Sequence, residues 1–301
     1  MNPRATGPSI EAYRTEPYPS RVSGGTRPKA YRADLPLVSV VCICRNAERA
    51  LGRCIKSVAD QDYANIEFII FDGASTDGTV EVLRQFDREI TFWASEPDKG
   101  RNDAFNKALA AASGEYLTVV MADDWLSPDF ITASVQALKR HGTDYVFGDR
   151  MLHAPDGTVL YKLPGSADFA KGLRNWMTIN SPSFTIRRRL LEEIGLFNDI
   201  SVASDYDWFL RAHNAGFRGA YDPSILYHFE IGGLSTFSAF QGYRDNMRLA
   251  LKYGARPSQA FLAYLSNVSR HCARVVLGAL LPDVVLLGLR RFRHKWKGSL
   301  Q

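Results

Sequence analysis

The stretch that decides the fold is FIIFDGASTDGT, residues 68–79, where an apolar run stops at an aspartate and gives way to glycine, serine and threonine. An unbroken apolar run is typical of a strand buried on both faces of a parallel sheet. A second such run, Leu37–Ile43, precedes it, and helix-spaced apolar residues lie between the two runs, from Leu51 to Ala59. Helix-spaced residues recur after it, from Val80 to Phe86. Strand, helix, strand and helix in this order predict an α/β fold with a parallel sheet.

The alternation continues to about residue 127 and then changes. We expect strands at Ile90–Trp93 and Tyr116–Met121, with a helix between them that is stopped by Gly114. Beyond Pro128 the pattern predicts a helix, a short strand and a hairpin, which is typical of an α+β unit appended to the sheet. The expected organisation is a disordered lead (1–34), one domain in two halves (35–127 and 128–235) and a helical C-terminal region with a basic tail (236–301).

Composition excludes several classes of protein. Of the 301 residues, 46% are hydrophobic and 23% are charged, which excludes collagen, coiled coil and wholesale disorder. The net charge is +5, and residues 290–297 contain five basic residues and no acid. Because this excess sits in one tail and not on a folded face, we expect no nucleic acid partner. The four cysteines contain no CxxC pair, which favours reduced thiols in a cytoplasmic protein. The polar N-terminus lacks the apolar core of a secretory signal, which favours the same location.

Polar residues stand directly after the predicted strands, where ligands bind in a doubly wound sheet. They include Asn46, Asp72, Lys99 and the adjacent pair Asp123 and Asp124. A GxGxxG loop is missing, and the loop with P-loop spacing lacks the Lys-Ser/Thr that should follow it. A bound nucleotide would therefore need other neutralisation, for which a divalent metal on the acidic pair is suited. The alternative is that this pair caps the following helix.

These blocks together resemble the family 2 glycosyltransferases. The resemblance covers about Leu37 to Gly233 and rests on five ordered blocks at matching spacings. It implies a GT-A fold, with a Rossmann-like, mostly parallel sheet, an appended α+β acceptor half and C-terminal helices. It also implies a nucleotide-sugar donor, a divalent cation (Mn²⁺ or Mg²⁺) and inversion at the anomeric carbon. The blocks are Val38–Val41 with Asn46, Ser57–Gln61, Phe68–Thr79, Asp98–Lys107 and Ser113–Asp124.

The resemblance assigns donor-side roles residue by residue. Asp72 matches the aspartate that reads a uracil ring, and the alternative role is that of a turn carboxylate before a helix. Asp123 matches the ribose-side carboxylate, and Asp124 matches the metal ligand. Donor-cleft positions are also matched by Asn46, Lys99 and Asp103.

The second half carries the acceptor chemistry that the resemblance implies. Asp205 matches the catalytic base, but Ser204 stands where many relatives have glutamate, and this leaves Asp207 as a rival. Ser204 to Asp207 is also an S-x-x-D capping signature, in which Asp207 would serve the cap and Asp205 would face the cleft. His228 is a candidate third metal ligand or phosphate contact beside Gly232 and Gly233, or else a structural histidine.

The C-terminus joins an apolar stretch, 275–289, to the basic run 290–297. The apolar stretch is too short and too interrupted to span a bilayer, but the combination suits a helix in a membrane interface. The alternative is a helix packed on the protein's own core. We expect a protein peripheral to the inner face of the plasma membrane, with a glycan or polyprenyl-linked saccharide as acceptor.

The expected function is a metal-dependent inverting glycosyltransferase that uses a nucleotide-sugar, with a UDP-sugar favoured, in cell-surface polysaccharide synthesis. Two other classes stay open. A sugar nucleotidyltransferase would share the sheet and the metal, and a non-catalytic membrane-binding module would keep only the fold.

Overall fold

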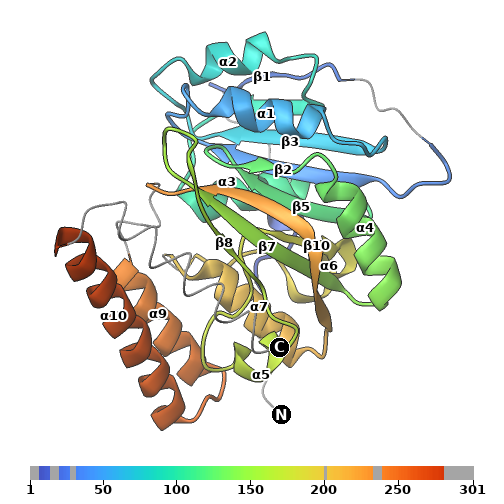
Figure 1. The fold of residues 1–301 in the computed structure, drawn as a ribbon. Coiled ribbons are helices and arrows are strands. Elements are labelled where there is room, and N and C mark those ends of the chain that lie inside the picture. Colours follow the sequence, from blue (N-terminus) through green and yellow to red (C-terminus); the bar gives the residue numbers. More distant parts are fainter. Residues whose placement is uncertain (1–6, 14–19, 28–31, 200–201, 233–238, 281–301) are drawn as a thin grey trace.

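The computed structural model describes residues 7–13, 20–27, 32–199, 202–232 and 239–280. Its centre is one sheet in the order β1-β4-β3-β2-β5-β9-β7-β10-β6, with β8 paired to β7 (Figure 1). The four neighbours β4, β3, β2 and β5 are parallel, and β9 joins the two halves by antiparallel pairing with β5 and β7. The strands are β1 (Val22–Gly24), β2 (Val38–Cys44), β3 (Ile66–Asp72), β4 (Phe92–Ser95), β5 (Tyr116–Met121), β6 (Trp125–Leu126), β7 (Tyr145–His153), β8 (Val159–Leu163), β9 (Phe184–Arg187) and β10 (Gly219–Glu230).

Helices cover both faces of the sheet. Alternate residues of β2 point to opposite faces, so that Val41 and Ile43 pack in one core and Val40 and Cys42 in the other. The first core includes α3, α6 and α7, and the second includes α1, α2 and α4. The helices are η1 (Glu11–Tyr13), α1 (Leu51–Ala59), α2 (Thr79–Gln85), α3 (Arg101–Ala111), α4 (Phe130–His141), α5 (Phe169–Leu173), α6 (Arg188–Ile194), α7 (Ser204–Asn214), α9 (Ala239–Lys252) and α10 (Pro257–Leu280).

The α/β fold is confirmed, with two local corrections. The strand expected at 90–93 is β4 at Phe92–Ser95, because Ile90 is buried in the core without belonging to a strand. The helix expected to stop at Gly114 already ends at Ala111. The parallel set has a switch point between β2 and β5, where the order of strands along the chain reverses. Ligands of open α/β sheets bind at this point.

The expectation of a disordered lead is wrong for the described parts of residues 1–34. Strand β1 pairs antiparallel with β4, and Gly7 N donates to Ile194 O (2.9 Å). These contacts are mainly backbone hydrogen bonds, which a search for apolar periodicity does not detect. Gly7 is required here because a Cβ would lie 1.9 Å from Leu196 O.

The C-terminal region is a pair of helices, α9 and α10, that lies beside the sheet domain, with α10 on the outside (Figure 1). Among the described residues, none of the helices has the length and apolar character needed to cross a bilayer. The basic run 290–297 and the end of the apolar stretch lie outside the described residues, as do Gly233, Leu234 and Ser235.

Candidate active site

A cavity of about 840 Å³ lies at the carboxyl end of the parallel strands, at the switch point between β2 and β5. This volume falls within the range of small-molecule sites. Its walls come from both halves of the domain. The first half contributes residues 43–50, 77, 98, 100, 101, 104, 105, 119 and 121–124, and the second half contributes residues 181, 182, 184, 197, 202, 204, 205 and 229.

Asp124 is the most deeply buried carboxylate of the cavity wall, at 1% exposure. Tyr227 OH donates to its Oδ2 (2.8 Å), and the Glu230 amide donates to its Oδ1 (2.9 Å). Burial, followed by the charge of Asp123, raises the pKa of Asp124 to about 8. Because Asp124 bonds to β10 and α4 starts only at Phe130, the helix-capping alternative is wrong.

Asp123 is half-buried and lines the cavity beside Asp124. Burial raises its pKa as well. Arg53 holds the backbone of this segment, because its Nη2 donates to the Asp123 carbonyl oxygen (2.8 Å) and to Glu230 Oε2 (2.6 Å). The Arg53 guanidinium also stacks over Trp125, at 3.9 Å from the ring centroid.

The acidic pair fits a divalent cation by the chemistry of its donors. Carboxylate oxygens are the ligands that Mg²⁺ and Mn²⁺ prefer, and each Asp124 oxygen accepts one hydrogen bond and keeps a lone pair. Two adjacent carboxylates with raised pKa values are also costly to ionise together without a cation. In the part of the chain that the structure describes, no three His, Cys, Asp or Glu side chains form a group that could hold a metal.

His228 lies on β10 near this pair but does not belong to the cavity wall. Its Nδ1 contacts His153 Nε2 (2.9 Å), its Nε2 contacts Ser127 Oγ (3.2 Å), and its ring stacks on Trp125. Both ring nitrogens therefore have protein partners. Burial and the neighbouring His153 lower the pKa of His228 to about 4. This environment favours the structural alternative over the metal ligand.

The predicted donor residues separate into two groups. Asn46 lines the cavity, and its Oδ1 accepts a hydrogen bond from Thr76 N (3.0 Å). Asp72 is 1% exposed and lies behind the cavity wall, where it accepts hydrogen bonds from Ser75 and Ser95. The hydrogen bond that the Ser75 backbone amide donates to Asp72 Oδ2 (2.9 Å) closes the turn that the alternative role of Asp72, a turn carboxylate, predicts.

Lys99 and Asp103 do not line the cavity either. Asp103 accepts a hydrogen bond from Lys99 N (3.1 Å) and pairs with Lys107 (3.3 Å), so it stabilises the start of α3. Asp98 lines the cavity from the same loop, and it packs so close to Gly73 that a Cβ there would lie 2.2 Å from Asp98 Oδ2.

Asp205 reaches the cavity from the first turn of α7, where it is half-buried. Asp207 is 0% exposed and turned away from the cavity. It pairs with Arg211 Nε (3.0 Å) and accepts hydrogen bonds from Asn198 Nδ2 (2.9 Å) and Tyr253 OH (2.8 Å). Asp205 is therefore the one of the two carboxylates that can meet a substrate.

The S-x-x-D capping prediction is wrong. The N-cap position of α7 is occupied by Ala203, which makes no side-chain capping bond, and Ser204 is already the first helical residue. Asp207 serves the buried ion pair and not the cap. This pair also ties α7 to the preceding loop, because Arg211 donates to the carbonyl oxygens of Ile194 and Leu196.

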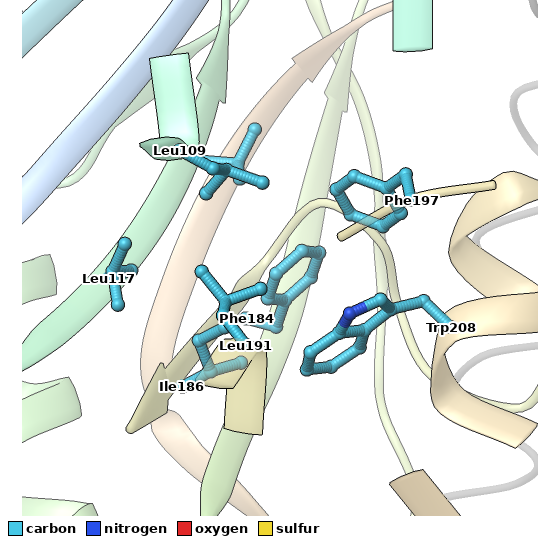
Figure 2. A pocket seen from close by; sticks show the side chains of 8 residues that line it. Leu109, Leu117, Phe184, Ile186, Leu191, Phe197 and Trp208 are labelled. Atoms are coloured by element: carbon cyan, nitrogen blue, oxygen red, sulfur yellow. The ribbon is translucent and has the colours of Figure 1, made fainter. Parts of the chain in front are cut away.

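The floor of the cavity rests on an apolar layer that Figure 2 shows in close-up. Phe184 and Phe197 line both the large cavity and a small void of about 10 Å³ beneath it. The void is no larger than one water molecule and is walled only by apolar side chains and Trp208. The layer therefore supports α7 and the cavity floor and is not a second binding site.

Sequence reasoning missed Arg150 on β7. Its Nη1 donates to Ser181 O (2.8 Å), a residue of the cavity wall, and its Nε is buried without a hydrogen-bond partner. Burial lowers the pKa of this guanidinium, while the charges of Asp124 and Asp205 oppose that effect. Nothing local in the sequence marks Arg150, because its partners lie on other strands.

These features define an α/β protein with an acidic cavity at the switch point of its sheet, and comparison with known proteins assigns its family. The profile described as Glycosyl transferase family 2 matches residues 39–196. The chain belongs to this family and is a glycosyltransferase, as its blocks predicted. It is 34% identical over 184 residues to an uncharacterised glycosyltransferase of Mycobacterium tuberculosis strain H37Rv, an alignment that covers 59% of this chain and 69% of that protein.

A second relative is TuaG of Bacillus subtilis, named as a candidate glycosyltransferase of teichuronic acid biosynthesis. It is 34% identical over 146 residues, which is 46% of this chain and 58% of TuaG.

Two solved structures share the fold. S. aureus TarS 1-349 in complex with UDP-GlcNAc has a TM-score of 0.58 at 17% identity, covering 79% of this chain and 73% of that one. The mannosyltransferase PcManGT from Pyrobaculum calidifontis, in complex with GDP-Man and Mn²⁺, has a TM-score of 0.59 at 19% identity, covering 94% and 85%. The expected GT-A fold is thereby confirmed.

Proposed function

We propose that this enzyme is a metal-dependent inverting glycosyltransferase that moves a sugar from a UDP-sugar to a hydroxyl group of a glycan or polyprenyl-linked acceptor. The observation that carries the proposal is that Asp123 and Asp124 from one half and Asp205 from the other line the same cavity. The family resemblance assigns roles to four acids, Asp72, Asp123, Asp124 and Asp205. Three of them line the cavity, and Asp72 lies directly behind it.

The proposed reaction is a single displacement at the anomeric carbon. Asp205 accepts the proton of the acceptor hydroxyl while its oxygen forms a bond to that carbon. The bond from the carbon to the diphosphate breaks on the opposite face, and the nucleoside diphosphate departs with the electron pair. A divalent cation held by Asp124, with Asp123 beside it, would supply positive charge for the leaving diphosphate.

The proposed nucleotide and pathway are supported by what is named for the relatives. UDP is favoured by the UDP-GlcNAc complex of TarS, whereas PcManGT holds GDP-Man. A role in cell-surface polysaccharide synthesis is supported by the name of TuaG and by that of WcaA from Escherichia coli, a candidate colanic acid glycosyltransferase. The proposed location is cytoplasmic, at the inner face of the plasma membrane, where a lipid-linked acceptor would be reached.

The test is a panel of nucleotide-sugars with Mn²⁺ or Mg²⁺, scored by thermal stabilisation and by the nucleotide released. The proposal expects protection by UDP and release of UDP, and NMR of the product should show an inverted anomeric centre. Release of pyrophosphate would indicate a nucleotidyltransferase instead. Full transfer by Asp124→Ala and Asp205→Ala would refute the assigned site, and no transfer by the wild type would revive the non-catalytic alternative.

A further inference from the structure

The pair α9 and α10 (the C-terminal hairpin) carries most of the exposed large apolar side chains of the described residues. It holds five of the seven. A monomeric soluble protein rarely exposes such a concentration without an interaction partner. The five are Phe240 (55% exposed), Leu251 (41%), Phe261 (52%), Leu262 (64%) and Leu265 (41%).

The apolar residues of α10 form one outward face. Residues of an α-helix follow each other at about 100°, so Phe261, Leu262 and Leu265 share one side. The other side faces α9, because Ala260 is fully buried and the His271 ring contacts Phe240 (5.0 Å between ring centroids). Since α10 is the outer helix of the hairpin, its apolar face points away from the catalytic domain (Figure 1).

The charge of the hairpin indicates what this face meets. Residues 239–273 contain five basic residues and one acid, Asp245. The chain beyond α10 adds the basic run 290–297. A helix with an exposed apolar face in a basic surrounding matches anionic lipid, since its apolar side chains enter the headgroup boundary while basic side chains meet the lipid charge. The basic residues are Arg244, Arg248, Lys252, Arg256 and Arg270.

We propose that the outward face of α10, formed by Phe261, Leu262 and Leu265, is the docking surface for an anionic lipid membrane. This places the contact on the described hairpin, in addition to the tail at 275–297 that the sequence suggested. A second copy of the chain suits the face less well, because a two-fold contact would bring two hairpins of like charge together.

This inference rests on the proposed membrane location of the enzyme, but its test is independent of transfer. The full chain is floated with vesicles of phosphatidylglycerol and phosphatidylcholine, or of phosphatidylcholine alone, without donor or acceptor. We expect the wild type to bind the anionic vesicles and to be released by high salt. Leu262→Glu should lower the partition coefficient by about tenfold or more. Val159→Glu is the matched control, since Val159 is 51% exposed on β8, and it should bind like the wild type.

Three results would overturn the proposal. Vesicle binding by Leu262→Glu as strong as that of the wild type would assign binding to the tail alone. A concentration-dependent dimer without vesicle binding, abolished by Leu262→Glu, would identify a second copy as the partner. A lower melting temperature for Leu262→Glu, together with no vesicle binding by the wild type, would show that the chain's own residues cover the face.

Discussion

Asp205 and Asp207 stand two residues apart in α7, and the structure predicts opposite consequences for their loss. Asp207→Ala removes the fully buried partner of Arg211 and leaves that guanidinium unpaired at 2% exposure. Breaking a buried ion pair in this way costs about 3–5 kcal/mol, a large part of the roughly 5–15 kcal/mol that a domain has. Asp205→Ala removes a half-buried side chain and should change the free energy of unfolding by about 1 kcal/mol or less. It should lower kcat by about 10²–10⁴-fold, the usual contribution of a general base.

The assay is urea unfolding of each variant, together with transfer measured on the folded fraction. Because Asp207→Ala can fail to fold, Tyr253→Phe supplies a milder change that removes one hydrogen bond to a charged acceptor. It should cost about 1.5–3 kcal/mol. Tyr243→Phe is its control, since that hydroxyl lies 3.4 Å from His271 Nδ1 within the hairpin. The assignment is refuted if Asp207→Ala keeps wild-type stability but loses transfer while Asp205→Ala remains active.

Three further predictions concern the surroundings of Asp124, the metal and His228. Tyr227→Phe removes the donor to Asp124 Oδ2 and should raise the Mn²⁺ concentration for half-maximal activity by about 10–100-fold, with kcat at saturating metal little changed, in a metal titration. EDTA should abolish transfer, and added Mn²⁺ should restore it in the wild type but not in Asp124→Asn. Because the folded-state pKa of His228 is about 4, below its unfolded value near 6.5, the unfolded chain binds the extra proton between these values. Stability should therefore fall as pH decreases from about 6.5 to 4, by at most about 3 kcal/mol, and urea titrations of His228→Gln should show a weaker pH dependence.

The parallel half of the fold was predictable because its strands are continuous apolar runs. Tyr116–Met121 agrees with β5 residue for residue, and the apolar runs Ile66–Phe71 and Leu37–Ile43 agree within one residue at each end with β3 and β2. The antiparallel strand β9 was not predicted. It has only four residues, and it exists because it pairs with β5 and β7, which lie far away in the chain.

The candidate site, like the fold, was predictable from the sequence only in part. Strand-end reasoning predicted Asn46, Asp123 and Asp124 as cavity residues, because the carboxyl ends of parallel strands share one edge. It could not separate Asp123 from Asp72, since both follow apolar runs and only the packing of Ser75 and Ser95 buries the latter.

The residues that surround Asp124 could not be predicted from local sequence patterns, because their positions depend on the register of the sheet. Arg150 stands opposite Tyr227 in the parallel pairing of β7 with β10. That register brings the tyrosine hydroxyl to Asp124 and the guanidinium close to the same carboxylate. A shift of β10 by one residue would turn Tyr227 to the other face of the sheet, away from Asp124 and Arg150.

Asp124 and Asp205, which line the cavity from its two halves, are held by separate parts of the fold. Asp124 is fixed by hydrogen bonds from β10, whereas the helix of Asp205 is fixed by the Asp207–Arg211 pair, which binds the loop before α7 and the C-terminal hairpin. The Arg150 guanidinium interacts with the charges of both Asp124 and Asp205. The halves that carry Asp124 and Asp205 are joined by the strand pairing of β5 with β9 and of β9 with β7. The hairpin contacts the domain at α7, where α9 packs against this helix and Tyr253 donates to Asp207. The proposed lipid-docking face of α10 and the proposed base Asp205 are therefore joined by one continuous set of contacts.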